Sequence, residues 1–223
     1  MIVLAIDTAG TACNVALYDA ARDVTLSTAG ADIGRGHAER LMGFIDDALA
    51  SAGVAMDKVD RIAVTIGPGS FTGIRVGVAT ARGLGLALGR PVVGISVLQA
   101  LALSALALAP GRPVLVVTDA KREEVYLQPF DGEGQPTAEA EARDVGAARA
   151  NFATFAGTIS GSGASLLRDD AADEAIERPS DTADIAVVAK LGATVDPAIA
   201  LPKPLYLRGP DVRSQAGFAV ARA

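Results

Sequence analysis

Along the first half of the chain, short apolar runs alternate with segments in which apolar residues recur at intervals of three and four positions. Continuous apolar runs are typical of buried strands, and the longer spacing is typical of helices with one buried face. The predicted strands span residues 2–6, 12–18, 23–29, 61–66 and 92–95, and the predicted helices span residues 37–52, 74–88 and 97–108. Strands that alternate with helices predict an α/β fold.

The second half of the chain begins with the same pattern as the first. Strand 2–6 ends in Asp7 and leads through a turn into another strand, and strand 114–118 likewise ends in Asp119 before a turn and a strand. Because about half the chain separates the two acids, we expect a duplicated unit. The predicted lobes are residues 1–110 and 111–223. Further predictions are a strand at 124–130, a loop and edge strand at 132–143, a glycine turn at 161–165, a capped helix at 181–192 and an extended tail at 202–212.

A glycine-rich turn, GPGSFTG at 67–73, joins a predicted strand to a predicted helix. This layout can direct free backbone N–H groups at an anion. No lysine follows Gly73, so the P-loop pattern fails, and Pro68 and Thr72 break the G-x-S-x-G pattern of a serine nucleophile. The alternative is a tight turn in which Ser70 or Thr72 caps the helix.

The helix predicted at 74–88 is apolar or small almost all round, and Gly77, Ala81 and Gly85 recur at every fourth position. A stripe of small residues allows another backbone to approach closely. The sheet of the chain itself accounts for one face. The other face predicts a second helix, from this chain or from a partner.

Composition narrows the function classes. The 223 residues carry a net charge of −6, 4% aromatic residues and no tryptophan, which argues against a surface that grips nucleic acid by itself. The single cysteine excludes an intrachain disulfide, and the single histidine, His37, excludes a two-histidine metal site within one chain. Residues 91–111 are uncharged but divide into a strand and a helix, so we expect a cytoplasmic protein without a membrane span.

Two hairpin turns that each carry an acid resemble the turns that hold nucleotide phosphates in the two-lobed actin-like ATPase and sugar-kinase (ribonuclease H-like) fold, with its duplicated mixed-sheet subdomains. The candidates for a vestigial phosphate site are Asp7, Thr8, Thr11 and Asp119. The second turn lacks the glycines of active members, and Glu123 and Glu124 would repel an anion. We therefore expect no complete ATP hydrolysis or phosphoryl transfer by this chain alone.

Several stretches are similar to the TsaB (YeaZ) family of bacterial threonylcarbamoyladenosine (t6A) biosynthesis proteins. The specific one is GPGSFTGIRVG at 67–77. Weaker ones are IDT at 6–8, HAERL at 37–41, DA at 119–120, EVY at 124–126 and YLR at 206–208.

The resemblance implies a non-catalytic subunit that binds and activates a TsaD-like catalytic subunit, which transfers threonylcarbamoyl to the adenosine next to the tRNA anticodon. It also implies a TsaE-like ATPase as partner, a homodimer of the isolated chain, contact with tRNA only through the complex, and ATP or ADP only at the partner interface, with no catalytic residue, metal or cofactor of its own.

Members of this family dimerise through the two helices of the first lobe. The partner interface implied in this way comprises Leu41, Ile45, Ile74, Gly77, Ala81 and Gly85. We expect Gly77→Leu to abolish association with the partner while the chain still folds. The alternative function is a two-lobed ATP-dependent kinase or ATPase that uses Asp7 as its catalytic acid.

Overall fold

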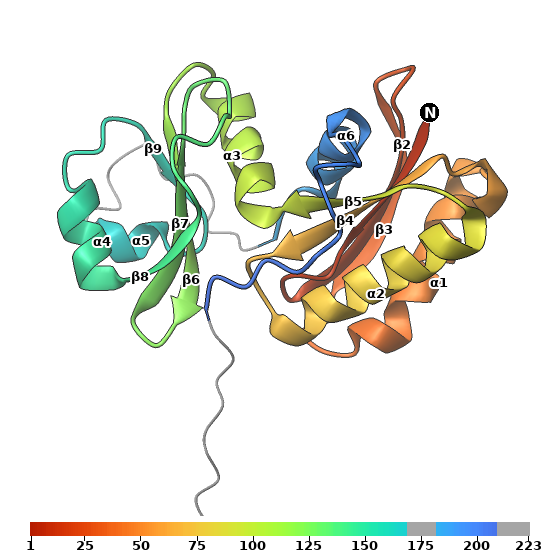
Figure 1. Ribbon diagram of the computed structural model, residues 1–223, viewed down its shortest axis with the longest axis horizontal. Coiled ribbons are helices and arrows are strands. Elements are labelled where there is room, and N and C mark those ends of the chain that lie inside the picture. Colours follow the sequence, from red (N-terminus) through yellow and green to blue (C-terminus); the bar gives the residue numbers. More distant parts are fainter. Residues whose placement is uncertain (169–181, 209–223) are drawn as a thin grey trace, which may run out of the picture.

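The computed structural model describes residues 1–168 and 182–208, which form two mixed β-sheets with helices around them (Figure 1). The first sheet has five strands in the order β3-β2-β1-β4-β5. Its strands are β1 (Ile2–Asp7), β2 (Ala12–Asp19), β3 (Val24–Asp32), β4 (Arg61–Gly67) and β5 (Val92–Ser96). Strands β1, β2 and β3 are antiparallel neighbours, whereas β4 lies parallel to β1 and β5 lies parallel to β4.

The second sheet repeats the centre of the first. Its four strands run in the order β8-β7-β6-β9. They are β6 (Val114–Lys121), β7 (Glu124–Phe130), β8 (Glu141–Asp144) and β9 (Thr158–Ser160). Strand β6 pairs antiparallel with β7 and parallel with β9, as β1 pairs with β2 and β4. The predicted duplication of mixed-sheet subdomains is confirmed.

Helices cover both faces of the first sheet (Figure 1). The helices in the described residues are α1 (His37–Ala52), α2 (Phe71–Leu88), α3 (Val97–Leu108), α4 (Val145–Phe152), α5 (Ala164–Leu167) and α6 (Ile185–Thr194), with a 3-10 turn η1 (Met56–Lys58). Successive side chains of a strand point to opposite faces. Leu4 and Ile6 of β1 therefore pack with α1 and α2, whereas Val3 and Ala5 pack with α6. Burial of both faces explains why β1 reads as a continuous apolar run.

Helix α3 lies between the two sheets and belongs to the same core as both. Its Leu98 and Ala102 share one apolar cluster with Leu4 of the first sheet and with Val116 and Phe130 of the second. The uncharged segment 91–111 is thus divided between β5 and α3, as predicted. No helix in the described parts of the chain is long and apolar enough to cross a membrane.

Most predicted elements are present, with shifted ends. Helix α2 begins at Phe71 rather than Ile74, because the Ser70 hydroxyl accepts a hydrogen bond from Gly73 N (3.2 Å) and caps it. The helix predicted at 181–192 is α6, which Asp184 caps. Position 181, like 209–212 of the predicted tail, lies outside the described residues.

Helix α6 packs on the first sheet although it follows the second one in sequence. The Arg61 guanidinium of β4 donates to the carbonyls of Gly192 (3.0 Å), Ala193 (3.2 Å) and Val195 (3.0 Å). A cation at this end of a helix satisfies free carbonyls and complements the helix dipole. The predicted boundary between the lobes, at residues 110 and 111, falls between the two sheets and remains a prediction. It would assign α6 to the second lobe, although α6 covers the first sheet.

The residues of the predicted partner interface lie in the interior of the isolated chain. All six, Leu41, Ile45, Ile74, Gly77, Ala81 and Gly85, are buried within the chain itself. The small-residue stripe of α2 faces the first sheet: a Cβ added at Gly77 would collide with the Thr8 hydroxyl, and one at Gly85 would collide with Val92. A helix that is apolar almost all round gave no means of telling its inner face from its outer face.

Alanine substitutions at two glycines of α2 should therefore have opposite effects on stability. Gly83→Ala should raise the free energy of unfolding by about 1 kcal/mol, because alanine is the better helix former and no described atom lies within 4 Å of a Cβ at this position, the helix's own nearby backbone aside. Gly77→Ala should lower the free energy of unfolding, since overpacking costs about 1–3 kcal/mol. Urea denaturation of both variants measures the difference.

Stabilisation by both substitutions would show that Gly77 is not in close contact with Thr8. For the same reason, the expectation that Gly77→Leu would disturb only association is wrong, because a leucine there has no space in the folded chain.

Candidate functional site

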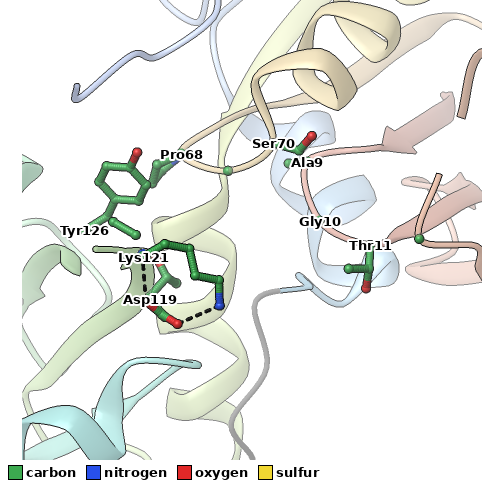
Figure 2. Close-up of a pocket in the computed structure, with 12 residues that line it drawn as sticks. Ala9, Gly10, Thr11, Pro68, Ser70, Asp119, Lys121 and Tyr126 are labelled. Atoms are coloured by element: carbon green, nitrogen blue, oxygen red, sulfur yellow. Dashed lines mark hydrogen bonds and ion pairs between the residues drawn. The ribbon is translucent and has the colours of Figure 1, made fainter. Parts of the chain in front are cut away.

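A cavity of about 310 Å³ lies between the two acid-bearing turns (Figure 2). From the first lobe, the turn after β1 and the glycine-rich turn before α2 line it, and from the second lobe the end of β6 and Tyr126 of β7. The lining residues are Ala9, Gly10, Thr11, Gly34, Pro68, Gly69, Ser70, Thr118, Asp119, Ala120, Lys121 and Tyr126. Of the four predicted phosphate-site residues, Thr11 and Asp119 line this cavity, whereas Asp7 and Thr8 do not.

The buried side chain of Asp7 is hydrogen-bonded to the backbone of the first turn. Its side chain is 1% exposed, and Oδ1 accepts hydrogen bonds from Ala9 N (3.0 Å) and from the Thr65 hydroxyl of β4 (2.7 Å). A buried carboxylate needs such donors to offset its loss of hydration. These bonds tie Asp7 to the interior of the first lobe.

Thr8 joins the first turn to α2. Its hydroxyl is fully buried and donates to the carbonyl of Gly73 (2.7 Å), while Ser70 N donates to the carbonyl of Ala9 (2.7 Å). A Cβ at Gly69 or Gly73 would collide with the carbonyl oxygen of Ala9 or Thr8. Gly69 and Gly73 are therefore explained by close approach to the neighbouring turn, and Ser70 rather than the exposed Thr72 caps the helix.

Asp119 is paired within its own turn. Its Oδ1 accepts a hydrogen bond from Lys121 N (2.7 Å), and Lys121 Nζ lies 2.6 Å from Oδ2, as the dashed lines in Figure 2 show. The hydrogen bond with the Lys121 ammonium lowers the pKa of Asp119 below its usual value. The Asp119 carboxylate and the Lys121 ammonium, which both line the cavity, therefore neutralise each other.

The backbone of this turn is left-handed at residues that are not glycine. Lys121, Arg122 and Glu123 have φ angles of 62°, 57° and 60°. Left-handed backbone costs about 1–2 kcal/mol per residue when a side chain is present. The turn thus has a glycine-like conformation but carries bulky, charged side chains.

The lining residues do not fit a magnesium nucleotide. The one cation among the described lining residues, Lys121, is paired with Asp119, and Glu124 in the same turn is paired with Arg208. In the described parts of the chain, no group of three or more histidine, cysteine or acidic side chains could hold a metal ion.

Two other chemically reactive side chains are buried away from the cavity. His37 is 8% exposed, and its Nε2 lies 3.3 Å from the carbonyl of Ala12. Cys13 is fully buried, and burial raises the pKa of its thiol to about 11. Neither residue is among those that line the cavity.

Sequence reasoning missed a cluster of Phe71, Arg75 and Tyr206. Arg75 Nε donates to the Tyr206 hydroxyl (2.9 Å), and its guanidinium carbon lies 3.7 Å from the centre of the Phe71 ring. The centres of the two rings are 5.1 Å apart. The signal available in the sequence was compositional: Phe71 and Tyr206 belong to the 4% of residues that are aromatic, and Arg75 is one of the two charged residues within 74–88.

The solvent-facing sides of α1 and α2 also carry an unusual set of residues. They comprise the exposed side chains of Met42 and Leu86 and the small residues Gly43, Ala79 and Gly83. A Cβ at Gly43 or Gly83 would meet no described atom within 4 Å outside the nearby backbone of its own helix. We call these five residues the outer face; none of them belongs to the interface predicted from sequence.

Comparison with known proteins gives consistent results. The model of the family "TsaD: tRNA N6-adenosine threonylcarbamoyltransferase" matches residues 31–158. The chain is 38% identical over 127 residues to the tRNA threonylcarbamoyladenosine biosynthesis protein TsaB of Haemophilus influenzae, covering 57% of this chain and 52% of the relative. It is 37% identical over 126 residues to the Escherichia coli protein of that name, covering 56% and 53%. The matched stretch thus spans about half the length of these curated relatives.

Solved structures extend the likeness to nearly the whole chain. YeaZ from Pseudomonas aeruginosa aligns with a TM-score of 0.77 at 27% identity, covering 92% of this chain and 99% of that one. A second Pseudomonas aeruginosa structure, described as similar to peptidase YEAZ, aligns with a TM-score of 0.74 at 28% identity, covering 93% and 99%. The predicted α/β fold with two mixed-sheet subdomains is confirmed, and it is the fold of these YeaZ structures.

Removal of the Lys121 ammonium should raise the pKa of Asp119. In Lys121→Met, the carboxyl should titrate closer to its ordinary value of 3.8 than it does in the parent chain. Because the folded-state pKa of Asp119 is lowered, the stability that the pair contributes is present above pH 3.8 and is lost as the pH falls through the folded-state pKa. NMR titration of the Asp119 carboxyl carbon measures the shift, and equal pKa values in both chains would contradict the pairing.

Proposed function

Because the chain belongs to the TsaD (tRNA N6-adenosine threonylcarbamoyltransferase) family and is of the TsaB/YeaZ type, we propose that it is a non-catalytic subunit in t6A biosynthesis. In this proposal it binds and activates a TsaD-like chain, which transfers threonylcarbamoyl to the adenosine next to the anticodon. The observation that carries the proposal is the Asp119–Lys121 pair, since it neutralises the only cation among the described residues that line the cavity.

The outer face is the surface that we propose for the partner. Gly43 and Gly83 lie within helices, where a glycine costs about 1 kcal/mol relative to alanine, and no close described contact within the chain offsets this cost. Exposed glycines allow the backbone of a second helix to come close. Leu86, which is 87% exposed, and Met42, which is 45% exposed, supply apolar area beside them.

The partner in this proposal is a TsaD-like chain, and in its absence a second copy of this chain takes the same surface. A TsaE-like ATPase completes the complex, with ATP or ADP at an interface between subunits rather than in the cavity of this chain. Because the net charge is −6, tRNA is contacted through the complex and not by this chain alone. The compartment implied by this proposal is the cytoplasm.

A leucine at Gly83 should weaken the complex without harming the fold. The new side chain would point away from the chain, because nothing described lies near a Cβ there except the helix's own backbone. It would block close approach of a partner helix, and we expect the dissociation constant for a TsaD-like chain to rise at least about tenfold, as for a central interface residue. Analytical ultracentrifugation of the mixture measures this change.

Ala150→Leu is the matched control, since Ala150 is exposed on α4 of the second sheet. The control should bind as the parent chain does. Unchanged binding of Gly83→Leu, with unfolding midpoints equal to those of the parent, would exclude the outer face as the partner surface. Sedimentation of the isolated parent chain and Gly83→Leu tests separately whether the homodimer uses this face.

The alternative function, a kinase or ATPase that uses Asp7, gains no support from the geometry, because Asp7 is 1% exposed and does not line the cavity. We expect the purified chain to release phosphate from ATP no faster than Asp7→Asn does. A colorimetric phosphate assay on both chains checks this. Turnover by the parent chain that is lost in Asp7→Asn would establish the alternative.

A further inference from the structure

The segment after α6 crosses from the first sheet to the second. Residues 199–208, which we call the strap, run past the ends of β5 and β4 toward β6 (Figure 1, blue). Gly94 N of β5 donates to the carbonyl of Ala200 (2.9 Å), and Leu205 N donates to the carbonyl of Ile66 in β4 (2.8 Å). The strap is thus bound to the first sheet by backbone hydrogen bonds at two points.

Two glycines make room for the strap. A Cβ at Gly94 would lie 2.5 Å from the carbonyl oxygen of Leu201, and one at Gly67 would lie 3.1 Å from that of Leu205. Gly67 also has a φ of 105°, which residues with a side chain rarely adopt. Gly67 at the end of β4 and Gly94 in the middle of β5 therefore match the path of the strap.

The first anchor of the strap is Tyr206. Its hydroxyl accepts a hydrogen bond from Arg75 Nε (2.9 Å), and its ring lies beside that of Phe71. Arg75 and Phe71 belong to the first two turns of α2. Cation–π contacts and hydrogen bonds of this kind hold a side chain even where it is partly exposed, and Tyr206 is 44% exposed.

The second anchor is Arg208. Its guanidinium forms an ion pair with Glu124 at the start of β7, and Nη1 lies 3.5 Å from the carbonyl of Ala120 in β6. Ala120 lines the cavity, between Asp119 and Lys121. Arg208 follows Tyr206 by two residues. Through Arg208, the strap therefore binds the turn that forms the second wall of the cavity.

Helix α3 joins the two sheets elsewhere, through its packing against β4, β5, β6 and β9. We propose that the strap is an interlobe latch. Tyr206, which binds α2, and Arg208, which binds the β6–β7 turn, together fix the width of the cavity, and release of either anchor lets the lobes move about α3. This inference concerns the isolated chain and does not rest on the proposed function.

The latch can be tested by measuring the distance between the lobes. Nitroxide labels at Asp46→Cys on α1 and Ala150→Cys on α4 use exposed positions in different lobes, while the buried Cys13 thiol resists labelling. Pulsed electron paramagnetic resonance then gives the distance distribution for the full chain. We expect a narrow distance distribution in the labelled parent. In Tyr206→Ala and Arg208→Ala, the distribution should be broader and shifted toward longer distances.

The controls separate the latch from a general loss of stability. Arg82→Ala removes an exposed arginine of α2 and should leave the distribution narrow. Combining Arg208→Glu with Glu124→Arg restores an ion pair of reversed polarity and should narrow the distribution relative to Arg208→Glu alone. If Tyr206→Ala does not fold, Tyr206→Phe replaces it, because this variant keeps the ring and loses only the hydroxyl. It should broaden the distance distribution less than loss of the whole Tyr206 anchor would.

The proposal is overturned if folded Tyr206→Ala, or Tyr206→Phe in its place, and folded Arg208→Ala give distributions that superimpose on the parent's. It is also overturned if Arg82→Ala broadens the distribution as much as they do. Circular dichroism of each labelled chain establishes that it is folded.

Discussion

The contact between the turn after β1 and the turn before α2 is the constraint on which the first lobe depends. The Thr8 hydroxyl donates to Gly73 O, Ser70 N donates to Ala9 O, and the buried Asp7 carboxylate fixes the backbone at Ala9. No side chain larger than hydrogen fits at Gly69 or Gly73. These contacts set where α2 begins, and hence both the first wall of the cavity and the orientation of the outer face.

The two lobes share a topology but differ in what their turns can do. The first turn is closed by hydrogen bonds to its own lobe, and the second is closed by the Asp119–Lys121 pair over left-handed residues that are not glycine. In the second turn, the pairing of Lys121 with Asp119 leaves no free cation among the described residues that line the cavity. A chain of this kind is suited to act through its surface.

Helix α2 links the two proposals made for this protein. Its inner face packs on the first sheet through small residues, its outer face carries Gly83 and Leu86, and its first two turns hold Tyr206 of the strap. Glycine inside a helix costs stability. On the inner face, close contact with the sheet accounts for that cost; on the outer face, a partner helix would account for it. In the two proposals, the same helix thus connects a surface for association with the width of the cavity.

The sequence by itself determined the local elements: the bounds of α1, α3 and β7 were predicted as the structure has them, because periodicity and turn residues act over short distances. It also determined the acid-bearing turns and the family. Only the tertiary structure decided which side of α2 is buried, since a pattern apolar almost all round does not orient a helix. The return of α6 to the first sheet and the pairing of Arg75 with Tyr206, 131 residues away, were equally beyond local patterns, because they depend on where the chain goes after the second sheet.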